Sequence, residues 1–211
     1  LPISGIVAGY LGTNALECLI ENVYVSGTVS GIQQVGGIGG IFAKGTVRNC
    51  YADVKVIGSS RAGGIVAEPR NAVVVENCFA TGTLYSTGNA GGIAGGLNGN
   101  NPTIKGCIAW NEQIDGEPVS GRVIGWQSNT YTKATDCYAK KDMIIAWGPN
   151  KGMTGADANT AGTYDWGNNK TAICHGITTE NSVDAAKKIG WSTDIWDLSG
   201  VTPLLKSFND K

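Results

Sequence analysis

The sequence predicts an all-β protein, a parallel β-helix or β-solenoid of about five rungs that ends in a C-terminal cap containing a short helix. Three observations predict this class. A strand-like unit recurs five times, a glycine-rich block keeps step with it, and no stretch before residue 140 carries an apolar stripe of helical period long enough for a crossover helix. Such a chain coils on itself rather than closing one globule.

The recurring unit is a run of six residues with apolar or small side chains around a central corner residue. Its fourth positions are 27, 28, 29 and 30 residues apart, at Val23, Cys50, Cys78, Cys107 and Cys137. Short runs rich in Val, Ile and Tyr and bounded by glycine are typical of strands. We therefore expect equivalent residues to stack in parallel, about 4.8 Å apart along the axis.

The strand unit also predicts a corner. In the run Val47 to Ala52, Val47 and Cys50 are three positions apart, yet both have the character of interior residues. A bend at Asn49 reconciles them, because asparagine tolerates the left-handed backbone region. The corner residues of the five copies are then Asn22, Asn49, Asn77, Gly106 and Asp136. Polar surface residues with no corner role are the alternative interpretation.

Behind the corner, the cysteine positions predict an internal column of free thiols. Cysteine in such a row behaves as a small hydrophobe. Neighbouring rungs hold the Cβ atoms at the strand spacing, wider than the roughly 3.8 Å that a disulfide prefers. Spacings near 28 do not resemble a Cys-x-x-Cys metal site. A bridge from Cys18 or Cys174 stays open, although nothing in the sequence pairs them.

The residue before each corner carries a charge whose sign alternates from copy to copy: Glu21, Arg48, Glu76 and Lys105. Stacked on successive rungs, opposite charges attract weakly at the surface. We interpret this row as a device that fixes the order of the rungs.

A second block accompanies each strand unit, with Ile6, Ile38, Ile65, Ile93 and Val123 in a glycine context. The segments Gly-Gly-Ile-Val-Ala and Gly-Gly-Ile-Ala-Gly, with the runs Asn-Cys-Tyr-Ala and Asn-Cys-Phe-Ala-Thr-Gly, resemble the GLUG repeats of bacterial cell-surface proteins. The resemblance covers roughly residues 4 to 139, and the tail at 183 to 206 looks like the closing segment of such arrays. It implies a right-handed β-helix and an adhesin-like or surface-scaffold role, and it supplies no catalytic residue.

We predict two regions. Residues 1–139 form the β-helix repeats, and residues 140–211 form an irregular segment and a cap packed on the solenoid end. Within the cap, residues 182–189 read as a short helix, capped by Asn181 or Ser182 and stopped by Gly190. The apolar side chains that follow this helix, which include Trp191 and Trp196, are suited to covering the unpaired strands at the end of the solenoid.

The outward positions next to the cysteines give the candidate ligand surface. Tyr24, Tyr51, Phe79 and Tyr138, with Ile108 between the last two, form a row of aromatic side chains on which a glycan or a partner protein could pack. The alternative is that these side chains stack on one another and are covered by loops or by the tail. An exposed row favours ligand contact, and a covered row favours a structural role.

The amino-acid composition limits the classes of partner that the chain is expected to bind. Charged residues make up 16% and the net charge is −1, which gives no electrostatic case for nucleic acid, and no apolar run approaches a membrane span. We expect no cofactor and no bound metal, a monomer, and an extracellular or outer cell-surface location reached through an export signal in the parent protein.

The function expected from the sequence is that of a non-catalytic, adhesin-like surface module that binds a glycan or protein through exposed loops or side-chain ladders. The alternative is a structural spacer in a larger surface protein. A β-helix polysaccharide-degrading enzyme is less favoured, because the aligned copies bring no group of carboxylates together. Glu112, Asp115 and Glu117 are close only in sequence, and His175 is the single histidine.

Overall fold

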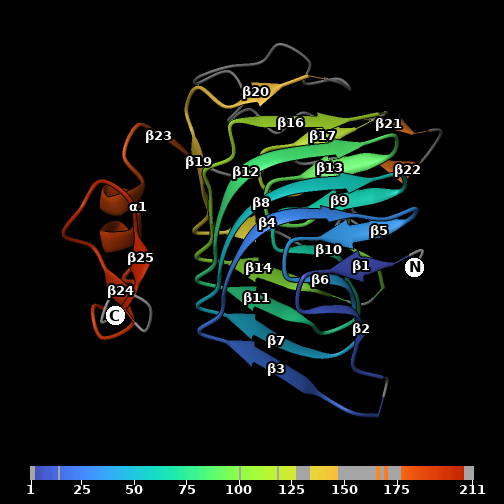
Figure 1. Cartoon of the computed structure of the whole chain (residues 1–211), viewed down its shortest axis with the longest axis horizontal. Coiled ribbons are helices and arrows are strands. Elements are labelled where there is room, and N and C mark those ends of the chain that lie inside the picture. Colours follow the sequence, from blue (N-terminus) through green and yellow to red (C-terminus); the bar gives the residue numbers. More distant parts are fainter. Residues whose placement is uncertain are drawn as a thin grey trace.

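The computed structural model describes residues 3–13, 15–99, 101–117, 119–126, 134–146 and 177–206, and the strand backbones at 165–166 and 169–170. The chain is a β-solenoid built from parallel sheets, with a short helix near the C-terminus (Figure 1). The predicted fold class is confirmed, since the strands wind through about five turns and pair with the turns above and below.

Each turn passes through four parallel sheets in the same order. The first turn contains β1 (Ser4–Gly5), β2 (Ala8–Leu11), β3 (Cys18–Glu21) and β4 (Tyr24–Ser30). The second contains β5 (Gln34–Gly36), β6 (Gly39–Phe42), β7 (Gly45–Arg48) and β8 (Tyr51–Gly58), and the third β9 (Arg61–Gly63), β10 (Val66–Pro69), β11 (Val74–Glu76) and β12 (Phe79–Ser86).

The fourth and fifth turns keep the order with shorter strands. The fourth contains β13 (Asn89–Gly91), β14 (Thr103–Lys105), β15 (Ile108–Ala109) and β16 (Gln113–Gly116). The fifth contains β17 (Ser120–Gly121), β18 (Ala134–Thr135), β19 (Tyr138–Lys140) and β20 (Ile144–Ile145). In both turns the second sheet is reduced to an isolated bridge, which links Ala94 to Val66 and to Ile124.

The pairing register is the one that the repeat spacing predicts. Ala80 pairs with Ala52 on one side and with Ala109 on the other, and Ala109 pairs with Ala139, which gives displacements of 28, 29 and 30 residues. Because every pair lies in parallel register, each side chain stands over its equivalent in the next turn.

The glycine block makes a reversal too tight for side chains. A Cβ atom added to Gly36, Gly63 or Gly91 would lie 2.1 Å from the carbonyl oxygen of Gly39, Val66 or Ala94, respectively. Such a contact is far inside van der Waals distance, so the backbone of the first sheet returns as the second sheet only with glycine at these positions. Ile38, Ile65 and Ile93, at the reversal, are fully buried in the core.

The predicted corner between the third and fourth sheets is confirmed. Asn22, Asn49, Asn77, Gly106 and Asp136 have φ values of 57°, 52°, 51°, 58° and 51°. These values lie in the left-handed region, where glycine, asparagine and aspartate are the least strained residues. The corner ladder therefore explains why the copies allow only these three residue types there.

The column of thiols lies in the interior, as predicted. Cys50, Cys78, Cys107 and Cys137 are buried as free cysteines. Each sulfur lies 3.2 or 3.3 Å from the carbonyl oxygen two residues earlier, that of Arg48, Glu76, Lys105 or Thr135. The S–H group, a weak donor, therefore faces the carbonyl group of the residue before the corner. A valine at this position could not donate to that carbonyl group.

The alternating charges also pair as predicted. Arg48 Nη2 lies 2.6 Å from Glu21 Oε2, and Lys105 Nζ lies 2.7 Å from Glu76 Oε2. Each pair joins adjacent turns across the third sheet. Both pairs are partly exposed, so each contributes at most about 1 kcal/mol.

Arg122 fills a position that is glycine in earlier turns. A Cβ atom added to Gly64 or Gly92 would lie 2.0 or 2.2 Å from a carbonyl oxygen of the following turn. Arg122 is nevertheless completely buried, and its guanidinium donates hydrogen bonds to the carbonyl oxygens of Lys140 and Lys141. The Arg122 side chain fits in the fifth turn because it extends to the carbonyl oxygens of Lys140 and Lys141. Gly64 and Gly92 instead lie directly under the glycine block of the next turn.

The C-terminal segment starts at the end of the solenoid and then turns back along its side. Strand β23 (Ile177–Thr179) pairs with β19 and extends the fourth sheet. Helix α1 (Ser182–Lys188) follows, with Asn181 as its N-cap, and Gly190 after it has a φ of 76°. Strands β24 (Trp196–Asp197) and β25 (Leu204–Leu205) form an antiparallel pair. A second antiparallel pair is formed by β21 (Asp165–Trp166) and β22 (Asn169–Lys170).

The predicted placement of the cap needs a correction. We expected it on the solenoid end, but α1, β24 and β25 lie alongside the stacked turns (Figure 1) and form a second apolar cluster with the fourth sheet. The anchoring contact is a hydrogen bond of 2.8 Å from Trp191 Nε1 to the carbonyl oxygen of Gly106 at the corner. The outward aromatic row supplies the apolar surface that Trp191, Trp196, Leu198 and Leu205 cover.

Asn77→Ala is expected to destabilise the fold by about 1–2 kcal/mol, since alanine at φ of 51° carries the left-handed penalty. Asn77→Gly, the matched control, should change stability by less than about 1 kcal/mol. Chemical denaturation of the three proteins measures this. Equal stability of the alanine and glycine variants would contradict the corner argument.

Cys78, within the thiol column, is expected to be chemically unreactive in the folded protein. Burial raises the pKa of the Cys78 thiol well above its ordinary value, and the thiolate is the reactive form. A thiol reagent at neutral pH should modify the half-buried Cys18 before Cys78, which should react only at the rate of global unfolding. Peptide mass mapping over time distinguishes the sites, and rapid labelling of Cys78 without denaturant would refute the prediction.

Candidate functional site

The aromatic row exists as a continuous stack on the outside of the fourth sheet. The ring centroids of Tyr24 and Tyr51 are 5.0 Å apart, and those of Tyr51 and Phe79 are also 5.0 Å apart. Phe79 pairs in register with Ile108, and Ile108 with Tyr138. The sequence therefore correctly predicts which side chains lie together.

The row is largely covered, which favours the second of the two alternatives that the sequence left open, a row covered by the tail. Phe79, Tyr138 and Tyr51 are 0%, 5% and 9% exposed, and only Tyr24 in the first turn keeps 37%. Burial raises the pKa of the Tyr51 phenol above its ordinary value. Three of the four candidate residues are thus part of an apolar core.

Trp191 is the side chain that covers the row most directly. Its ring meets Phe79 edge-on with centroids 6.4 Å apart, and it stacks on Trp196 at 4.4 Å. Lys188 Nζ lies 5.8 Å from the centroid of the Tyr138 ring. The stripe that looked like a binding platform is the docking face for the protein's own C-terminal segment.

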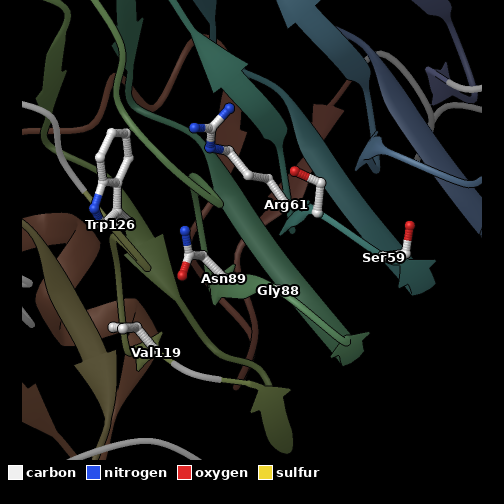
Figure 2. A pocket seen from close by; sticks show the side chains of 7 residues that line it. Ser59, Arg61, Gly88, Asn89, Val119 and Trp126 are labelled. Atoms are coloured by element: carbon white, nitrogen blue, oxygen red, sulfur yellow. The ribbon is translucent and has the colours of Figure 1, made fainter. Parts of the chain in front are cut away.

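A different hollow lies where the fourth sheet turns into the first. It has a volume of about 380 Å³ and is lined by Ser59, Ser60, Arg61, Gly88, Asn89, Val119 and Trp126. Figure 2 shows the side chains of Arg61 and Asn89 both extending toward Trp126. We call these residues the Trp126 pocket. They come from the starts of β9, β13 and β17 and from the chain just after the fifth reversal.

Backbone stacking brings this pocket together. Asn89 N donates to Ser60 O at 2.8 Å, and a Cβ atom on Gly88 would lie 2.1 Å from the same carbonyl oxygen. Leu97 N donates to Trp126 O at 2.7 Å, which holds the tryptophan backbone against the fourth turn. The sequence prediction missed this pocket, because its members are spread over three turns and share no local motif.

Arg61 links the pocket to a buried carboxylate. Its guanidinium carbon lies 5.0 Å from the centroid of the Trp126 ring, and Nη1 pairs with Oε2 of Glu68. Glu68 is fully buried on β10, and its Oε1 lies 2.5 Å from Arg70 Nε. Burial, and after it the charge of Arg70, lower the pKa of Arg61 below its ordinary value.

Two amide side chains complete the surroundings of Glu68. Asn98 Nδ2 donates to Oε1 at 3.0 Å, and Gln34 Nε2 donates to Oε2 at 3.3 Å. Both carboxylate oxygens therefore accept hydrogen bonds from cationic and neutral donors. This is the chemistry of a structural ion-pair network, which joins the second, third and fourth turns, rather than that of a proton-transfer group.

The other polar residues singled out by the sequence are placed only in part. Glu112 and Glu117 flank β16 with exposed side chains, and Asp53 accepts a hydrogen bond of 2.7 Å from Thr81 Oγ1 across adjacent turns. Within the described ranges, no three His, Cys, Asp or Glu side chains are arranged to hold a metal ion. Cys174 and His175 lie outside the described residues.

No family model, curated protein or solved structure matches the chain. Among the residues that the structure describes, no helix has the length and apolar character needed to cross a membrane.

Glu68→Gln is expected to cost about 3–5 kcal/mol, because it leaves Arg61 and Arg70 without their shared counter-charge in a buried site. Glu21→Gln removes an exposed pair of the same type and should cost less than about 1 kcal/mol. Urea unfolding of both variants measures the difference. Similar losses would show that burial adds nothing to the Glu68 pairs.

Proposed function

We propose that this chain is a non-catalytic module of an exported bacterial surface protein, in which the solenoid acts as a structural spacer. One observation carries the proposal, the burial of the aromatic row beneath the C-terminal segment. Side chains that serve as an internal docking face are not available to a partner. The GLUG-like repeats agree with this role, since such repeats belong to surface proteins.

The contacts between turns support the spacer role. β8 pairs along eight residues with β12 and along seven with β4, so a continuous sheet runs along the stack. The interior is filled by apolar side chains, and the exposed ion pairs and the buried Glu68 network tie successive turns together. In such a stack the hydrogen bonds between successive turns run along the axis, so they carry a force applied along it.

An enzymatic function is less well supported. Glycoside cleavage needs two carboxyl groups facing one substrate. Glu68 is enclosed by two arginines, and Asp53 bonds to Thr81, so the described acids that the fold positions closely are already engaged in structural contacts.

An adhesin-like function is the second candidate, and the Trp126 pocket is the observation that favours it. Ligand contact would then occur at the beginning of the first sheet and not on the aromatic row.

The spacer role predicts mechanical resistance. Pulled between reference domains in a single-molecule force experiment, the chain should unfold in one cooperative event, because neighbouring turns share their sheets and their core. Gradual peeling of turns at forces below those that open the reference domains would contradict the proposal.

The buried row gives the matching test of binding. On an array of glycans and matrix proteins, Tyr24→Ala should leave the pattern of the unmodified chain unchanged, since Tyr24 is the only row residue that keeps substantial exposure. A signal lost in Tyr24→Ala would restore the aromatic row as a ligand surface and count against the spacer role.

A further inference from the structure

The Trp126 pocket carries polar groups that the fold itself leaves unused. The side chains of Ser59, Ser60 and Asn89 form no hydrogen bond with any part of the chain that the structure describes. Arg61 Nε is buried and likewise has no hydrogen-bond partner there. Polar side chains without a partner in the protein that line one hollow together with an aromatic ring are a feature of ligand sites. We propose that this pocket binds a neutral pyranose sugar.

The aromatic part of the site is fixed before any ligand arrives. The Arg61 guanidinium packs over one face of the Trp126 ring and is itself held by Glu68. A Cβ atom on Gly96 would lie 2.8 Å from Arg61 Cδ and 3.3 Å from Trp126 Cε3, so glycine leaves the space that both side chains occupy. Such preorganisation lowers the entropic cost of binding.

The polar part lies within reach of the ring. Asn89 stands on β13 directly beside Arg61 on β9, and the two residues pair in register. Figure 2 shows both side chains pointing toward Trp126, with Val119 lining the same hollow. An amide, two hydroxyls and a guanidinium N–H offer both donors and acceptors, which matches a ring that carries several hydroxyl groups.

Charge favours a neutral sugar over an acidic one. Among the described residues that line the pocket, Arg61 alone is charged, and Glu68 already pairs with it. An anion would have to compete with this buried carboxylate. The apolar C–H face of a pyranose needs no such competition, because it packs against tryptophan and valine while its hydroxyls reach the polar groups. A volume of about 380 Å³ is within the range of small-molecule sites.

Saturation-transfer NMR on the full chain tests the site. The probes are the methyl pyranosides of glucose, galactose and mannose, and N-acetylglucosamine. At least one of them should receive saturation through its C–H face, with a dissociation constant on the order of 1 mM, as is usual for one small ligand in an open site. Trp126→Ala should weaken binding at least about tenfold, and Asn89→Ala about fivefold.

The matched control is Tyr85→Ala, which removes an aromatic side chain that is 47% exposed on β12 and does not line the pocket. This variant should bind as the unmodified chain does. If Trp126→Ala fails to fold, as judged by circular dichroism, Asn89→Ala alone decides the question.

Three outcomes would overturn the proposal: no transfer to any of the four neutral sugars, equal transfer in the chain carrying Asn89→Ala, and transfer to glucuronate in preference to all neutral probes. None of them touches the spacer role, which is tested by force and by the Tyr24 variant.

Discussion

Direct stacking of equivalent residues, about 4.8 Å apart along one axis, is the constraint on which the rest of the structure depends. It requires glycine at Gly64 and Gly92, where any side chain would meet a carbonyl oxygen of the following turn. It requires a left-handed residue at the corner that Asn77 represents. The same constraint aligns side chains of one kind into rows. The charges of a row must then be balanced, an inner row must fit the space inside the solenoid, and an apolar outer row must be shielded from water. The charged row alternates its sign, and the cysteine row fills a narrow interior.

The aromatic row is apolar and lies on the outside of the solenoid, so another part of the chain must cover it. Stacked tyrosine and phenylalanine rings would leave a wide apolar stripe in water, which is a common site of association. Here the chain covers the stripe with Trp191 and Trp196 and ties the cover to the corner through the bond from Trp191 to Gly106. The cover therefore stabilises several turns at once, and the hollow that stays open beside the solenoid is the Trp126 pocket at the start of the first sheet.

The Glu68 network and the Trp126 pocket are two sides of one arrangement. Arg61 contacts Glu68 with one nitrogen and lies over the Trp126 ring, so the buried carboxylate holds the residue that shapes the pocket. Burying a carboxylate is costly unless it is paired and hydrogen-bonded. Here two arginine and two amide side chains pair with the Glu68 carboxylate and offset that cost. The same contacts hold Arg61 in place at the side of the pocket.

The sequence by itself determined the repeat, the register, the corner and the inner cysteine column. Each of these is a local pattern repeated at a spacing of 27 to 30 residues, and parallel stacking converts such a pattern directly into neighbours in space. Only the tertiary structure decided where the C-terminal segment packs, which aromatic residues stay exposed, and that Glu68, Arg61 and Trp126 meet. Those contacts join side chains from different sheets, and their partners depend on the angle at each reversal and on the length of side chains, neither of which a repeat pattern contains.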